Sequence, residues 1–129
     1  MKFGVNYTPS HGWFHAWLDP DWDGIDNDLK QISELGMDHV RIFPIWPYLQ
    51  PNRTWINKKG VADVRRMVHI AGEHGLDAYV DVFQGHLSSF DFLPSWLVTW
   101  HAGNMFTDAD AVAAEREPVS YTHLRAHET

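Results

Sequence analysis

The chain has 129 residues, a formal net charge of −7 and no cysteine. An acidic chain without a run of Lys or Arg is a poor nucleic-acid binder, and a chain without Cys has neither disulfides nor thiolate chemistry. No segment approaches the ~20 apolar residues that cross a bilayer, so no membrane partner is expected. No signal peptide is visible ahead of the strand-like residues 3–7, which predicts a cytoplasmic protein.

Segments with strand character alternate with segments of helical periodicity, and a long loop follows each strand. The predicted elements are strand 3–7, loop 8–19, helix 20–35, strand 39–43, loop 46–59, helix 61–74, strand 78–83, loop 84–106 and a third helix beginning at Thr107-Asp108. Strands that alternate with helices imply parallel pairing with right-handed crossovers.

The entry to the second strand recurs at the third. Gly36-Met37-Asp38 precedes one strand and Gly75-Leu76-Asp77 precedes the other, 39 residues later. Each glycine is expected to end a helix in the left-handed conformation that glycine tolerates. The repeat therefore indicates successive βα units.

Two folds share this order of elements. A doubly wound nucleotide-binding fold needs a glycine-rich turn after its first strand, whereas this chain has the bulky run Asn6-Tyr7-Thr8-Pro9-Ser10-His11 there. Long βα loops with aromatic and polar residues favour a TIM (β/α)8 barrel, whose site is built from such loops. A complete barrel typically needs ~250 residues, so the sequence predicts an α/β fold that is part of such a barrel.

The C-terminal residues 119–129 resemble the translation of a transposase-type sequencing adapter. Segments of this kind are excluded from fold reasoning. The expected organisation is therefore residues 1–118 as the truncated N-terminal part of a barrel and residues 119–129 as a non-native tail.

Arg41 lies between Val40 and Ile42 in the second predicted strand. A buried arginine needs a carboxylate partner. That partner is either a catalytic carboxylate held by the guanidinium fork or a structural one from Asp38, Asp77 or Asp81, and the residue types alone leave both alternatives open.

Aromatic side chains are concentrated in the predicted loops, which hold most of the seven Trp. Aromatic walls with a few polar groups are typical of ligand pockets, and the flat faces of sugar rings stack on indole. We expect Trp13, Trp17 and Trp46 to contact ligand, and Trp96 and Trp100 to pack. A sugar-binding His86 and a solvated His86 both remain open.

Metal binding is not predicted. The run Asp19 to Gly24 resembles the start of a calcium loop, but Lys30 occupies the position of its bidentate glutamate. His69 and His74 are five residues apart on a helix and do not share a face.

Several segments together resemble the N-terminal part of retaining (β/α)8 glycosidases, first those of glycoside hydrolase family 5 (cellulases and mannanases) and second the family 42 β-galactosidases. The matching segments are Gly4-Val5-Asn6-Tyr7, Asp28-Leu29 to Leu35-Gly36, Val40-Arg41-Ile42, Trp46 with Gln50-Pro51, Gly75-Leu76 and Pro94-Ser95-Trp96-Leu97.

The resemblance implies a retaining glycosidase that acts on a β-linked glycan or glycoside without a cofactor, in which Arg41 supports the nucleophile. Its two carboxylates would lie about 5–5.5 Å apart on later strands, so none is assigned to Asp19, Asp81, Asp91 or Glu115 and the fragment is expected to be inactive. The expected substrate-binding residues are Asn6, Tyr7, His11, Trp13, Trp17, Trp46, His86 and Phe90.

Two alternatives to this function remain. One is a non-catalytic carbohydrate-binding barrel with the same aromatic residues. The other is an unrelated α/β-barrel enzyme in which Arg41 binds an anionic substrate. The oligomeric state does not follow from the sequence.

Overall fold

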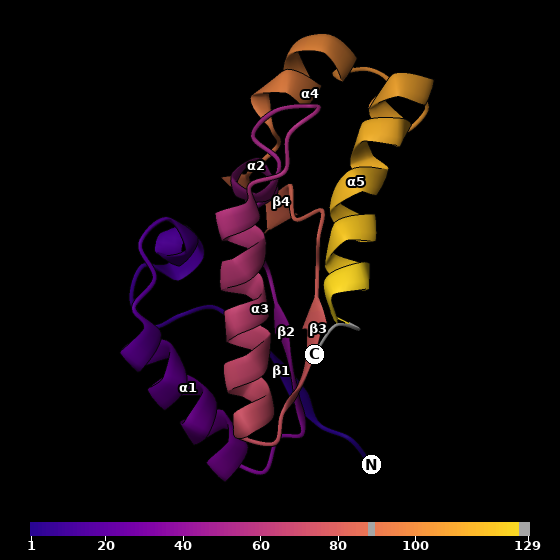
Figure 1. Cartoon of the computed structure of the whole chain (residues 1–129). Helices are drawn as coiled ribbons and strands as arrows, with labels where there is room; N and C mark the ends of the chain where they lie inside the picture. The colour runs from indigo at the N-terminus through magenta and orange to yellow at the C-terminus, as the bar shows by residue number, and fades with distance from the viewer. Residues whose placement is uncertain (88–89, 127–129) are drawn as a thin grey trace. The chain divides into compact units, whose positions relative to one another are not determined.

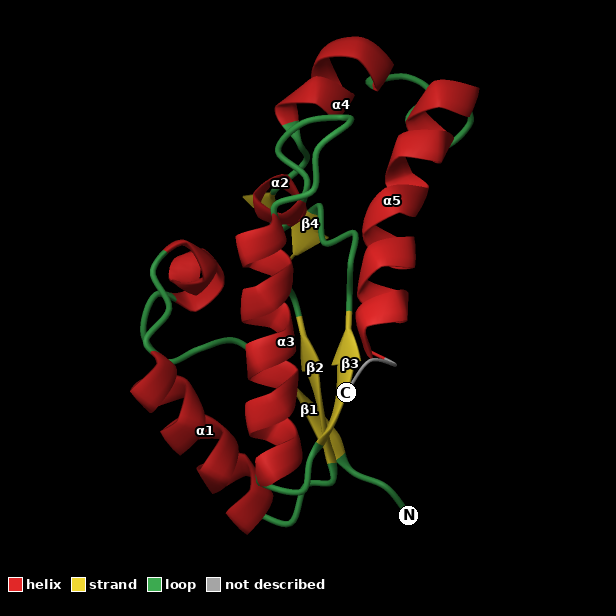
Figure 2. Cartoon of the chain, viewed as in Figure 1, coloured by secondary structure: helices red, strands yellow, loops and turns green. Residues whose placement is uncertain are grey.

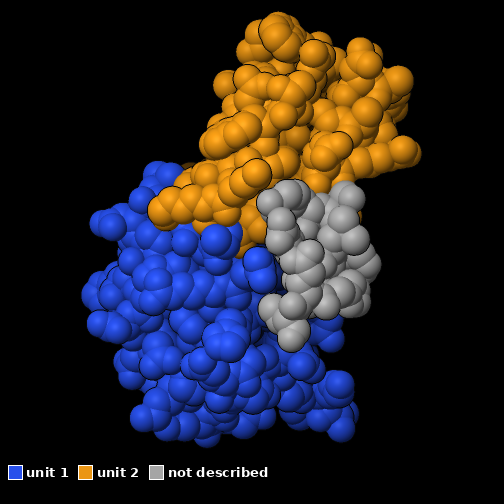
Figure 3. All heavy atoms as spheres, viewed as in Figure 1, with its two compact units in different colours: residues 1–44, 62–81 blue, residues 45–61, 82–129 orange. Residues whose placement is uncertain are grey.

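The computed structural model describes residues 1–87 and 90–126, and Figure 1 shows its helices and strands, most of them labelled. They are β1 (Gly4–Tyr7), the 3-10 helix η1 (Trp13–Leu18), α1 (Trp22–Glu34), β2 (His39–Ile42), α2 (Trp46–Leu49), α3 (Lys58–Glu73), β3 (Asp77–Val80), β4 (His86–Leu87), β5 (Phe90–Asp91), α4 (Ser95–His101) and α5 (Ala109–Ala126). Residues 1–44 with 62–81 form one compact unit, and residues 45–61 with 82–129 form a second (Figure 3).

The first unit contains a parallel sheet in the order β1-β2-β3. Helix α1 and most of α3 lie along one face of this sheet (Figure 2). Each parallel pair of strands is therefore joined by a helical crossover, as parallel pairing requires. The predicted βαβαβ order is confirmed.

The register of the sheet separates two rows of side chains. Tyr7, Ile42 and Val80 are lateral neighbours, and Tyr7 and Ile42 are buried. The adjacent row consists of Asn6, Arg41 and Tyr79, which are exposed. Because successive side chains of a strand point to opposite faces, this polar row lies on the face opposite α1 and α3.

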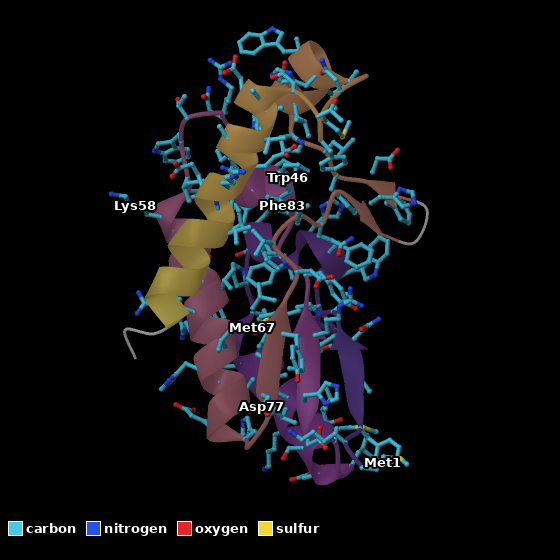
Figure 4. All side chains as sticks on the ribbon, turned by 90° about the vertical axis from the view of Figure 1, so that its right-hand side faces the viewer. Met1, Trp46, Lys58, Met67, Asp77 and Phe83 are labelled. Atoms are coloured by element: carbon cyan, nitrogen blue, oxygen red, sulfur yellow. The ribbon has the colours of Figure 1, made fainter. Side chains whose placement is uncertain are left out.

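Apolar residues of both helices pack against the sheet. Ile25 and Leu29 of α1 and Val64 and Met67 of α3 are buried, and Figure 4 shows Met67 directed from α3 toward the strands. Fully burying a side chain of this size contributes about 1.5–3 kcal/mol. The amphipathic spacing of these residues is what makes the two segments helical.

The predicted helix ends agree with the structure at both glycines. Gly36 has a φ of 92° and Gly75 a φ of 75°, so each adopts the left-handed conformation. At its other end α1 begins at Trp22 rather than at the predicted Pro20. The reason is that the Asp21 side chain accepts a hydrogen bond from the Gly24 amide at 3.1 Å and caps the helix.

Other predicted boundaries were wrong. Predicted loop 46–59 contains α2, predicted loop 84–106 contains the β4-β5 hairpin and α4, and predicted loop 8–19 contains η1. These elements have between two and seven residues, too few for a periodic pattern. Helix α3 begins three residues earlier than predicted, at Lys58, and β3 already ends at Val80.

The second unit has a small aromatic core and a long final helix. The core consists of Trp46, Trp96, Leu97, Ala111 and Ala114. Asp108 caps α5, as predicted, because its Oδ1 accepts hydrogen bonds from the amides of Asp110 (3.0 Å) and Ala111 (3.1 Å). Residues 127–129 of the predicted non-native tail lie outside the described residues. Across residues 1–87 and 90–126, none of the helices has the length and apolar character to span a bilayer.

Candidate functional site

Arg41 and Asp81 form an ion pair on the polar face of the sheet. Arg41 Nη2 lies 2.6 Å from Asp81 Oδ2, and the guanidinium carbon lies 5.2 Å from the centre of the Phe43 ring. Asp81 is thus the structural partner among the three aspartates considered above. The Arg41 side chain is 50% exposed rather than buried, since its register with Asn6 and Tyr79 puts it on the face opposite α1 and α3.

The two predicted site residues of β1 lie on opposite faces. Asn6 is the lateral neighbour of Arg41 and is exposed with it. Tyr7 is buried, and its hydroxyl donates a hydrogen bond to Asp28 Oδ2 at 2.8 Å. Burial and then the hydrogen bond to Asp28 raise the pKa of Tyr7 above its ordinary value. The structure therefore brings Asn6 and Arg41 together and gives Tyr7 a packing position.

The loop after β1 carries three further predicted residues. His11 is exposed, with its Nε2 4.0 Å from Asp21 Oδ2. Trp13 is 40% exposed and has a φ of 53°, a left-handed conformation that is unfavourable for a bulky residue. Trp17 is buried and donates its Nε1 hydrogen to the Phe43 carbonyl at 3.0 Å, so it packs.

Trp46 lies in the core of the second unit. It is 1% exposed, its ring centre lies 5.0 Å from that of Phe83 and 6.4 Å from that of Trp96, and Figure 4 shows Trp46 and Phe83 side by side. Trp96 is also buried, as expected of a packing residue. In this chain the Trp46 indole therefore has no face open to a ligand.

Gln50 holds this core together and was noted in the sequence only as part of a motif. Its Oε1 accepts a hydrogen bond from Trp46 Nε1 at 3.0 Å, and its Nε2 donates to the Ala114 carbonyl at 2.8 Å. Its own carbonyl accepts from Trp96 Nε1 at 2.9 Å. A fully buried amide with these partners cannot be recognised from residue type alone, because its partners lie up to 64 residues away.

His86 and Phe90 lie together in the β4-β5 hairpin. His86 Nδ1 lies 2.6 Å from Asp91 Oδ1, its cross-strand neighbour, and both side chains are exposed. Phe90 is half exposed and stacks on Phe92 with ring centres 6.5 Å apart. The hairpin thus presents an imidazole, a carboxylate and an aromatic face to solvent.

Two further tryptophans, one in the loop after α2 and one in α4, are exposed. Trp55 is 53% exposed and Trp100 65% exposed, with the guanidinium of Arg53 5.6 Å from the Trp100 ring. Trp100 was expected to pack rather than to contact ligand. Its contact is instead a surface cation–π pair.

Glu115 is an acidic residue whose side chain is buried. It is buried in α5 beside a cavity of about 490 Å³, and its Oε1 has no hydrogen-bond partner among the described residues. Burial raises the pKa of Glu115, and His101 opposes this in part. Glu115 lies within a helix rather than at the end of a strand, where barrel sites are built.

Residues that could hold a metal ion do not gather in the part of the chain that the structure describes, where no three His, Cys, Asp or Glu form a suitable group. His74 Nε2 lies 2.8 Å from Asp26 Oδ1, and His69 Nε2 lies 2.9 Å from Glu73 Oε1. These two histidines therefore have separate carboxylate partners.

Comparison with known proteins gives strong matches to solved glycoside hydrolases. A GH5_18 variant from Bifidobacterium longum subsp. longum ATCC 55813, in complex with Manβ1-4GlcNAc, is 97% identical over 95% of this chain, with a TM-score of 0.91. A second GH5_18 structure from the same strain is 92% identical over 99% of this chain, with a TM-score of 0.95. A GH5_18 variant from Streptomyces cattleya is 55% identical over 94% of this chain, with a TM-score of 0.90.

Among curated proteins, cellodextrinase A of Ruminococcus flavefaciens is 31% identical over 67 residues, which are 52% of this chain and 20% of that protein. The chain spans 29% of the length of each of the two variant chains and 31% of the length of the third solved chain. No protein-family model matches the chain. These matches confirm the predicted resemblance: the chain is similar to the start of the (β/α)8 barrel of family 5 glycoside hydrolases, and the three solved structures are of GH5_18 proteins.

Proposed function

We propose that the full-length protein containing this chain is a retaining glycoside hydrolase that cleaves a β-linked mannoside of the Manβ1-4GlcNAc type. The observation that supports it best is 97% identity, over 95% of this chain, with a GH5_18 protein solved in complex with that disaccharide. The chain spans only 29% of that relative, so both the activity and the substrate of the whole protein are part of the proposal.

In the proposed reaction one carboxylic acid protonates the leaving glycosidic oxygen while a carboxylate attacks the anomeric carbon. Water then hydrolyses the glycosyl–enzyme intermediate with the first residue acting as base. Both carboxylates are proposed to lie outside residues 1–129. Arg41 would support the nucleophile through its guanidinium N–H groups, which suit a carboxylate.

The proposed sugar-facing residues of this chain are those with exposed side chains. They are Asn6 and Arg41 on the polar face of the sheet, His11 and Trp13 in the loop after β1, and His86 and Phe90 in the hairpin. Tyr7, Trp17 and Trp46 also remain predicted substrate contacts, but burial of all three favours packing instead.

The full-length protein tests this function directly. Purified protein is incubated with Manβ1-4GlcNAc, and the anomer of the first mannose released is followed by proton NMR. Release of the β-anomer first supports a retaining hydrolase. Saturable binding of the disaccharide without release of mannose would indicate a non-catalytic carbohydrate-binding barrel. If the protein neither binds nor cleaves the disaccharide, the proposed function is wrong.

We also propose that residues 119–129 are not native. The match that covers 99% of the chain has lower identity (92%) than the match that covers 95% (97%), as expected if the additional aligned residues are mostly mismatches. Sequencing the source locus without an adapter tests this, because a native reading frame would diverge after Pro118. The predicted cytoplasmic location is likewise open to test, by fractionation of cells that express the full-length protein.

A further inference from the structure

The sheet fixes the backbone on both sides of the Arg41–Asp81 pair. Arg41 is the lateral neighbour of Tyr79, and Asp81 follows Tyr79 by two residues, directly after the end of β3 at Val80. The Asp81 amide donates a hydrogen bond to the Ile42 carbonyl at 3.0 Å, which continues the pairing of β2 with β3 beyond Val80. The carboxylate therefore extends from a fixed backbone position beside Arg41.

The guanidinium is held from a second direction as well. Its central carbon lies 5.2 Å from the centre of the Phe43 ring, and Phe43 is buried. The contact with Asp81 uses Nη2 at 2.6 Å. Because a guanidinium has five N–H donors, one carboxylate on Nη2 leaves donors for a second acceptor.

A contribution to the stability of the fold is a weak explanation for the presence of the Arg41–Asp81 ion pair. The side chains of Arg41 and Asp81 are 50% and 30% exposed, and ion pairs exposed to this degree contribute little to the free energy of unfolding. The short contact nevertheless restricts the orientation of a long, flexible side chain. A defined guanidinium orientation matters most where charge must be placed accurately.

We infer that Asp81 is a positioning residue that orients the Arg41 guanidinium toward the nucleophilic carboxylate of the proposed glycosidase. This inference rests on the proposed function. Asp81 neither touches the substrate nor exchanges a proton. Its negative charge and its place beside β2 hold Arg41 so that the unused N–H donors face the reacting centre.

The first test replaces Asp81 with Asn in the full-length protein, which keeps the size of the side chain and removes its charge. We expect kcat on Manβ1-4GlcNAc to fall at least about tenfold, with KM changed by less than about twofold, because only transition-state support is lost. The melting temperature is expected to change little. The matched control is Asp77→Asn, an exposed aspartate at the start of β3, four residues before Asp81, and this variant is expected to leave kcat unchanged.

A double-mutant cycle separates action through Arg41 from an independent effect. In an Arg41→Ala background, measured on an activated aryl β-mannoside, Asp81→Asn is expected to cause no further loss. An unchanged kcat in the single Asp81→Asn variant, or the same loss in both backgrounds, would overturn the inference. Failure of the proposed function would be seen separately, as a wild-type protein without β-mannosidase turnover, and the positioning role would fall with it.

Discussion

The hydroxyl of Tyr7 joins β1 to α1. It donates to Asp28 Oδ2, which also accepts hydrogen bonds from the amide and hydroxyl of Ser10, each at 3.0 Å. Burial and the neighbouring carboxylate both disfavour the phenolate, so the pKa of Tyr7 is raised. The Tyr7 phenol therefore stays protonated in the folded protein and serves as a hydrogen-bond donor that holds the structure together.

Replacing Tyr7 with Phe in the full-length protein is expected to lower the free energy of unfolding by about 1 kcal/mol at pH 7, since one buried hydrogen bond is lost. The unfolded-state pKa of Tyr is about 10, and the folded-state pKa of Tyr7 is higher. The stabilisation is therefore fully present below about pH 10 and is lost as the pH rises, because only the unfolded state releases the proton. Urea unfolding of both proteins from pH 7 to pH 11 checks this, and a difference between them that stays constant to pH 11 would contradict it.

At the scale of elements, helices α1 and α3 end in the same way. Gly36 and Gly75 adopt positive φ angles, and a strand follows each after two residues or fewer. A side chain at such a position is strained by its own backbone, whatever space surrounds it. The repeated glycine is therefore a requirement of the αβ turn.

Two glycine substitutions near the end of α3 are expected to have opposite effects. Gly75→Ala is expected to lower the free energy of unfolding by about 1 kcal/mol, because the Cβ of alanine makes the left-handed conformation at this position unfavourable. Gly72→Ala lies inside the helix with open space around the added methyl group and is expected to raise it by about 0.5–1 kcal/mol. Chemical denaturation of both variants in the full-length protein measures the two changes. If both substitutions change the free energy of unfolding in the same direction, this account of the turn is wrong.

At the scale of the whole molecule, the chain supplies three neighbouring strands of a barrel that needs eight. β1 and β3 are the outer strands of this sheet, and each has one side without a strand partner in the sheet. Edges of this kind pair readily with other chains. Residues 1–118 thus contain correctly ordered βα units whose barrel is not closed.

Purified residues 1–118 are expected to release no mannose from Manβ1-4GlcNAc, because three strands cannot bring two catalytic carboxylates together. They are also expected to self-associate through the open strand edges. A glycosidase assay and light scattering after size exclusion measure the two properties, with the full-length protein as the positive control. Clear turnover by monomeric 1–118 would contradict the proposal that both catalytic carboxylates lie outside this chain.

The sequence alone determined the order of the three parallel strands with α1 and α3 between them, the two glycine helix ends, the Asp108 cap and the resemblance to family 5 glycosidases. These features depend on local periodicity, on single-residue conformational preferences and on short motifs, all of which are written within a few neighbouring residues. The same locality explains why α2, α4 and the β4-β5 hairpin were missed, since elements of two to seven residues carry no periodic pattern.

Only the tertiary structure decided which candidate residues are exposed. Asn6 and Tyr7 are adjacent in the chain, yet one is exposed beside Arg41 and the other is buried beside Asp28. Trp46 looked like a ligand contact but is enclosed by Phe83, Trp96 and Gln50. The carboxylate that pairs with Arg41 belongs to Asp81, 40 residues away in the chain. Each outcome depends on strand register and on packing between distant segments, which residue type and local spacing do not encode.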